Sequence, residues 1–232
     1  MNATVLTFTP RNDCIDFAGP HDCEGSPINP DYGDNVVGAF HNGFEYGSLF
    51  GDTPNVVVDY LPDDQPPFTI FRSIFGDLEW AMDKNGDNRP WFEIMFTADA
   101  PHDVALHSFD LAGITTVVIP QPIDFWVSVT VLDGGGAVLR NVGDLHVVRD
   151  TRTSVVFPTP VVGRVLRLRI DTSRLGLESD SLGIDNVAFG QLGEPIPETR
   201  SIDLFAAGVV LLGFFWALRI THRSPAIFGD DR

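Results

Sequence analysis

Strand-length apolar segments recur from residue 54 to residue 190 and limit what this chain can fold into. Each segment is six to eleven residues long, is rich in Val, Ile, Phe, Trp and Thr, and is separated from the next by Gly, Pro or Asp. Before residue 200 the sequence shows no convincing helical period. We therefore predict strands at 54–61, 89–98, 102–111, 114–120, 123–133, 137–142, 153–158, 164–171 and 183–190.

Alternation inside these segments indicates strands that are buried on one side. Leu166 and Leu168 alternate with Arg167 and Arg169, which predicts a strand with a basic outer face. In the segment FWVSVTVL, Val127, Val129 and Val131 share the face of Phe125, whereas Trp126, Ser128 and Thr130 take the other. The sequence DGGG at 133–136 predicts a hairpin between two strands. Many short antiparallel strands predict an all-β fold for residues 1–192, a two-sheet sandwich of the jelly-roll or galactose-binding kind.

The charge of the chain excludes one class of partner. There are 32 acidic residues against 15 basic ones, a formal net charge of −17, and the only lysine is Lys84. Nucleic-acid binding depends on clustered Lys and Arg, so we expect no nucleic-acid partner.

The C-terminal part differs from the rest of the chain. Leu204 to Leu218 is a run of fifteen residues without a charged, amide or hydroxyl side chain, and Arg219 and Arg223 follow it. A helix of that length measures about 22 Å, shorter than a hydrocarbon core of about 30 Å, so it spans by thinning the bilayer and by snorkelling of Arg219. The alternative is a helix buried in a protein core. We predict a transmembrane helix at 201–221, a cytoplasmic tail at 222–232 and a domain outside the cytoplasm.

Several stretches give the chain a resemblance to a known group. YGDNVVG (32–38), GDTPNVVVDY (51–60), FGDLEWAM (75–82), VALHSFDLAG (104–113) and LGIDNVAFGQ (182–191) resemble bacterial exported proteins with a PEP-CTERM sorting signal. The end of the chain has the same order of parts: the IDNVAF strand, a linker at 193–200 with Pro197 and Glu198, an apolar helix and basic residues. The resemblance implies processing by an exosortase-like membrane enzyme and release to the cell surface or extracellular matrix.

The two cysteines and the N-terminus bear on export. Cys14 and Cys23 lie in a Gly/Pro-containing loop and either form a local disulfide, as in oxidising compartments, or remain two free thiols. The first residues, MNATVLTFTP, have neither a basic nor an apolar signal region and already suit a first strand. We expect the sequence to begin where a mature domain begins, with a lost signal segment upstream.

Two places suit a structural calcium ion. Asp83, Asn85 and Asp87 alternate as in the first half of a calcium loop, but Ile94 stands where an acidic ligand is expected. The alternative for this loop is a plain hairpin turn. Asp185, followed by Asn186, is the second place, and its alternative is an Asx turn that enters the last strand.

Carbohydrate binding and carbohydrate hydrolysis remain the two alternatives for the domain. Trp80, Trp91 and Trp126 either stack on sugar rings or fill the core. Glu93 and Asp110 lie on the strands predicted above and Glu79 is also expected on a strand, where a pair of carboxyls could serve a glycoside hydrolase or lyase. There is no zinc spacing of His, no nucleophile elbow and no nucleotide-binding loop. We expect a non-enzymatic surface or matrix protein that binds polysaccharide, with the hydrolase as the alternative.

Overall fold

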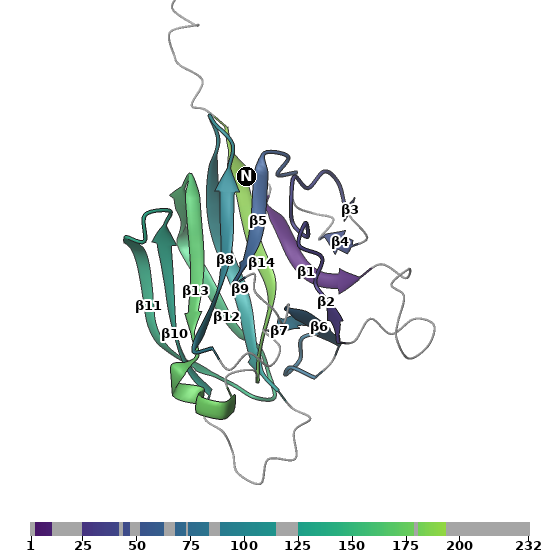
Figure 1. Cartoon of the computed structure of the whole chain (residues 1–232), viewed down its shortest axis with the longest axis vertical. Helices are drawn as coiled ribbons and strands as arrows, with labels where there is room; N and C mark the ends of the chain where they lie inside the picture. The colour runs from purple at the N-terminus through teal and green to yellow at the C-terminus, as the bar shows by residue number, and fades with distance from the viewer. Residues whose placement is uncertain are drawn as a thin grey trace, which may run out of the picture. The chain divides into compact units, whose positions relative to one another are not determined.

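The structure is a computed structural model that describes residues 3–10, 25–41, 44–46, 52–62, 68–72, 74–83, 89–114, 125–178 and 181–193. All of them belong to one compact unit, Met1–Gly193 (Figure 1). The strands are β1 (Thr4–Pro10), β2 (Ser26–Pro27), β3 (Phe40–His41), β4 (Phe44–Tyr46), β5 (Val56–Leu61), β6 (Thr69–Arg72), β7 (Trp80–Asp83), β8 (Trp91–Ala98), β9 (Asp103–Gly113), β10 (Phe125–Asp133), β11 (Val138–Val147), β12 (Thr153–Gly163), β13 (Val165–Asp171) and β14 (Leu182–Leu192).

The described strands form two antiparallel sheets, as the sequence predicts. The nine-stranded sheet has the order β2-β6-β7-β14-β1-β4-β3, with β9 on β14 and β12 on β9. The five-stranded sheet has the order β11-β10-β13-β8-β5. The last strand, β14, pairs with β1, β7 and β9, so it holds the nine-stranded sheet together.

The hydrophobic core lies between the two sheets. Alternate residues of β10 and β13, such as Val129 and Leu168, are fully buried from one sheet, and Ile184 of β14 is buried from the other. The rings of Phe96 on β8 and Phe189 on β14 join the sheets, with centroids 4.8 Å apart. This shared core makes the described part of the chain a β-sandwich.

Long strands are found where the apolar segments predict them. Eight of the nine predicted segments overlap β5 or one of β8 to β14, and residues 115–120 of the remaining one lie outside the described residues. The hairpin between β10 and β11 is confirmed, with a backbone hydrogen bond from Asp133 to Ala137 at 2.9 Å. The sequence did not indicate the short strands β2, β3, β4, β6 and β7 or the 3-10 helix η1 (Ser173–Glu178).

The described residues contain no helix with the length and apolar character needed to cross a bilayer. The predicted transmembrane helix at 201–221 lies outside the described residues, as do the linker and the tail.

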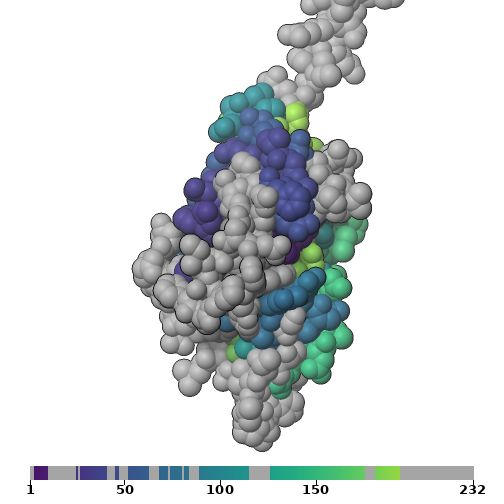
Figure 2. All heavy atoms as spheres, turned by 90° about the vertical axis from the view of Figure 1, so that its right-hand side faces the viewer, coloured from purple at the N-terminus to yellow at the C-terminus, as the bar shows by residue number. Residues whose placement is uncertain are grey.

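A second, smaller apolar cluster covers the outer face of the nine-stranded sheet. Phe75 packs there with Leu78, Ala81 and Ala112. A Cβ added at Gly183 of β14 would lie 2.6 Å from Cγ of Phe75, so the ring rests directly on the strand backbone. Figure 2 shows the blue surface of the residues near 75 beside the green surface of the residues near 150.

Candidate functional site

Two carboxyls are neighbours on the outer face of the nine-stranded sheet. Leu182 and Ile184 point into the main core, so the alternation of β14 directs Asp185 to the other face. Asp110 of β9 is the register partner of Asp185. Directly opposite residues in antiparallel strands have Cβ atoms about 5 Å apart, which brings the two side chains together.

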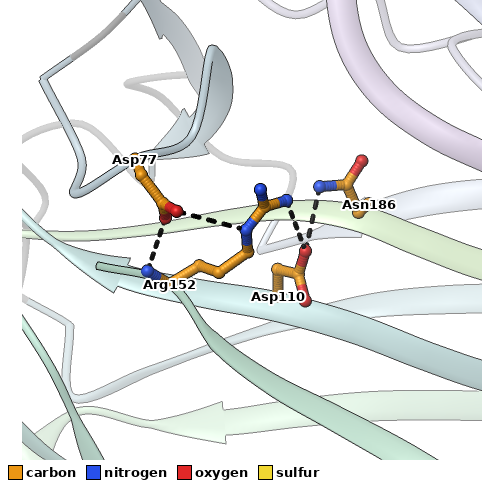
Figure 3. A network of polar contacts seen from close by, with 4 residues as sticks. All are labelled: Asp77, Asp110, Arg152 and Asn186. Carbon is orange, nitrogen blue, oxygen red and sulfur yellow. Dashed lines mark hydrogen bonds and ion pairs between the residues drawn. The ribbon is translucent and has the colours of Figure 1, made fainter.

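Three further residues complete this acidic cluster, which we define as Asp77, Asp110, Arg152, Asp185 and Asn186. Figure 3 shows Arg152 between two carboxylates, with its Nη1 3.5 Å from Oδ2 of Asp110 and its Nε 3.5 Å from Oδ2 of Asp77. The backbone N–H of Arg152 donates to Oδ1 of Asp77 at 2.6 Å. The amide Nδ2 of Asn186 donates to Oδ2 of Asp110 at 2.9 Å. Segments distant in sequence thus meet at Asp110.

Asp185 is the member of the acidic cluster that the network does not neutralise. The residue is 5% exposed, and its Oδ1 has no hydrogen-bond partner in the described part of the chain. Burial raises the pKa of Asp185 to about 8; the Asn186 backbone N–H and Arg152 oppose this, and the charges of Asp110 and Glu79 add to it. The Asp185 carboxyl is therefore mostly protonated at neutral pH.

The arrangement places a protonated acid beside a second carboxyl that accepts hydrogen bonds. Asp110 accepts hydrogen bonds from Asn186 and Arg152, whereas Asp185 retains a proton that it can donate. A proton donor beside a second carboxyl is an arrangement that general acid–base chemistry uses. Both side chains are shielded from solvent, since Asp185 is 5% exposed and the side chain of Asp110 is 13% exposed.

A backbone irregularity positions the amide that holds Asp110. The pairing of β14 with β9 shifts register between Asp185 and Ala188, and Asn186 has a φ of +51° in this bulge. Asn tolerates the left-handed region better than most residues. The sequence predicted either a cation site or a turn at Asp185 and Asn186, and the structure places both inside a strand.

A different set of polar and aromatic side chains covers the outer face of the five-stranded sheet. Trp126 is 40% exposed, and its ring lies 4.9 Å from that of His146, its register partner on β11. Trp91 of β8 is half-buried and lies in line with Ser128, two residues along β10 from Trp126. Strand and residue spacings put the Cα atoms of the two tryptophans about 12 Å apart.

An ion-pair clamp lies beside Trp91 on this face. Glu93 is fully buried, although it points away from the core. Nε and Nη2 of Arg167 lie 2.7 Å from Oε2 of Glu93, and Nε of Arg169 lies 2.7 Å from Oε1. The guanidinium of Arg169 also lies over the ring of Trp91, 4.5 Å from its centroid. The basic outer face predicted for this strand is thus partly neutralised by one carboxylate.

The structure brings together only some of the residues that the sequence singled out. Trp91 and Trp126 share a face, whereas Trp80 begins β7 in the other sheet. Glu79 was expected to lie on a strand, but it is exposed just before β7 begins at Trp80. Asp83 is buried at the end of β7. The described residues contain no group of three His, Cys, Asp or Glu side chains that could hold a metal ion. Other predicted sites lie outside the described residues: Cys14, Cys23, Asn85, Asp87, Pro197, Glu198, Arg219 and Arg223.

Comparisons with known proteins give one structural alignment of low similarity. No protein-family model matches the sequence, and no curated protein matches it. Among solved structures, an arabinose-bound α-L-arabinofuranosidase of glycoside hydrolase family 51 aligns with a TM-score of 0.34 and 10% sequence identity. The alignment covers 82% of this chain and 31% of that enzyme chain, so this protein spans about a third of its length.

Proposed function

We propose that this protein is an exported, non-enzymatic surface or matrix component whose jelly-roll-like sandwich binds polysaccharide. The binding surface is the outer face of the five-stranded sheet, with Trp126 as the stacking position and Trp91, whose ring lies under the guanidinium of Arg169, beside it. The observation that carries the proposal is the exposure of Trp126, 40%, on a face that also presents His146 and Arg169. Aromatic rings supply apolar area for sugar faces, and the polar groups beside them supply hydrogen bonds to hydroxyls.

We expect a Trp126→Ala variant to bind polysaccharide roughly 3- to 10-fold more weakly, because one stacking ring is lost. The measurement is a glycan array of the full chain in mild detergent, with and without calcium, followed by titration of the best glycan. The matched control is Val156→Ala, which truncates a more exposed apolar side chain, 66% exposed, on β12 in the other sheet. No binding by the natural sequence, or equal binding by the Trp126→Ala variant, would contradict the proposal.

A glycoside hydrolase or lyase is the second candidate, and the pair Asp110 and Asp185 favours it. The two carboxyls are register partners, and one of them holds its proton to a pH of about 8. Retaining glycosidases place two carboxyl groups about 5 Å apart, and register partners such as these have their Cβ atoms about 5 Å apart, so their carboxyl groups are within reach of that spacing. Release of reducing ends from a bound glycan, abolished by Asp110→Asn, would establish the enzyme. Release that survives this substitution would exclude the pair.

The proposed location depends on the C-terminal segment. We propose that Leu204 to Leu218 anchors the exported chain in the membrane until an exosortase-like enzyme cuts near Pro197 and Glu198. A Val210→Arg variant is expected to lose about 2.5–3.5 kcal/mol of insertion free energy, because the charge lies at the centre of the apolar run. Membrane fractionation measures the loss, and Val210→Leu is the control. Retention of the Val210→Arg protein in membranes would contradict the anchor.

A further inference from the structure

Glu93 fixes the position of two arginines on the proposed binding face. Its carboxylate is fully buried beneath Arg167 and Arg169, whose side chains are 26% and 36% exposed. The Nε nitrogen of each arginine lies against the carboxylate of Glu93, and so does the Nη2 nitrogen of Arg167. Because the guanidinium groups are held before any ligand arrives, a ligand that binds them does not have to order them.

Arg169 keeps its outer edge available. Its Nη1 and Nη2 nitrogens have no hydrogen bond or ion pair with the residues that the structure describes, since its one ion pair is made by Nε. The flat side of the guanidinium lies against Trp91 at 4.5 Å. The free edge of a guanidinium is a planar fork of N–H donors whose spacing matches the two oxygens of a carboxylate.

The clamp has one more guanidinium than carboxylate, in a strongly acidic protein. Two guanidinium groups face the single carboxylate of Glu93, while the chain as a whole carries −17. Asp171 lies two residues along β13 from Arg169, and its carboxylate, which accepts the backbone N–H of Ser173 at 2.9 Å, offsets the extra positive charge at longer range. Attraction of an anion is therefore confined to direct contact with the edge of Arg169 and does not extend over the surface.

We propose that the fork of Arg169 binds the carboxylate of an acidic sugar, so that the ligand of this face is a uronate-containing polysaccharide. This inference rests on the proposed polysaccharide binding and names its ligand class. The uronate carboxylate lies against Nη1 and Nη2 of Arg169, and adjacent sugar rings extend over the outer face toward Trp126. Glu93 is a positioning residue in this site, because it acts through the two arginines.

Titration of the full chain with polygalacturonate and with dextran tests the proposal. The salt concentration is about 0.15 M, where a Debye length of about 8 Å screens repulsion from the rest of the protein. We expect polygalacturonate to bind and Arg169→Lys to weaken that binding at least about tenfold, because Lys lacks the planar fork. The control is Arg174→Lys, at an exposed arginine that pairs with Asp144 at 2.9 Å.

A second measurement does not depend on the folding of any variant. Free galacturonate should compete with polygalacturonate for the natural sequence, whereas galactose, which lacks the carboxylate, should not. Equal competition by both sugars, or an unchanged affinity of Arg169→Lys, would overturn the inference. Binding of dextran alone would also overturn it and leave the proposed function standing, and binding of no polysaccharide would overturn both.

Discussion

Replacement of Asp185 by Asn is expected to stabilise the folded protein at neutral pH, by an amount that grows as the pH rises. Asp185 is 5% exposed, and its Oδ1 has no hydrogen-bond partner among the described residues. Burial and the charge of Asp110 raise its pKa from 3.8 to about 8. Asn has the same shape and no charge, so it avoids the cost of ionising this buried group.

The direction in which the free energy of unfolding changes with pH follows from the number of protons bound in the folded and unfolded states. Between pH 3.8 and about pH 8 the folded protein keeps the Asp185 proton and the unfolded chain has released it. The free energy of unfolding that this group contributes is largest below pH 3.8, falls by about 1.4 kcal/mol per pH unit in that window and is constant above it. The total loss is on the order of 5 kcal/mol.

Urea unfolding of both proteins at pH 5, 6, 7, 8 and 9 measures this effect, because other titrating groups cancel in the difference. The gap between Asp185→Asn and the natural sequence should widen up to about pH 8 and then stay constant. Asp144→Asn, at an exposed residue paired with Arg174, is the control and should show a small gap that does not grow in this window. A gap for Asp185→Asn that stays the same at every pH would show that the carboxyl titrates normally.

Gly183→Val is expected to lower the free energy of unfolding by about 3–5 kcal/mol. A Cβ at this position would lie 2.6 Å from Cγ of Phe75 and 2.9 Å from Cβ of Ala81. The ring of Phe75 is almost fully buried and has to leave the strand to make room. The cost therefore resembles the loss of a buried phenylalanine, added to the strain of overpacking.

Denaturant titration compares this variant with Gly193→Val, at the end of the described chain, where a Cβ would meet nothing within 4 Å. That control should stay within about 0.5 kcal/mol of the natural sequence. Addition of Phe75→Ala to Gly183→Val should cost little more, because the ring is already displaced. A loss below about 1 kcal/mol for Gly183→Val alone would mean that Phe75 does not rest on β14.

The long strands could be predicted because each carries its own pattern of burial. The alternation around Val129 and Leu168 is local, and the structure buries these residues as expected. Strands such as β2, with two residues, and β6, with four, are too short to show a period. These short strands form because neighbouring strands supply their backbone hydrogen bonds. The sequence of one short segment does not show which strands will be its neighbours.

The polar sites depend on register, which the sequence does not show. Arg167 and Arg169 were predicted to lie on an outer face, but the burial of Glu93 arises because it pairs with Arg169 across β8 and β13. Likewise, Asp110 was noted as one carboxylate among many, and only the pairing of β9 with β14 brings it opposite Asp185. The bulge in the pairing of β14 with β9 then turns the side-chain amide of Asn186 toward Asp110.

The central place of β14 sets the time at which this protein can fold. Thr4 of the first strand pairs with Phe189 of the last, and β7 and β9 also need β14 as a neighbour. The nine-stranded sheet cannot close until the final strand has been synthesised, since contacts this distant in sequence form slowly and late. A chain that ends before residue 182 would leave β1, β7 and β9 each without one of their neighbours, so a truncation there should prevent the nine-stranded sheet from forming.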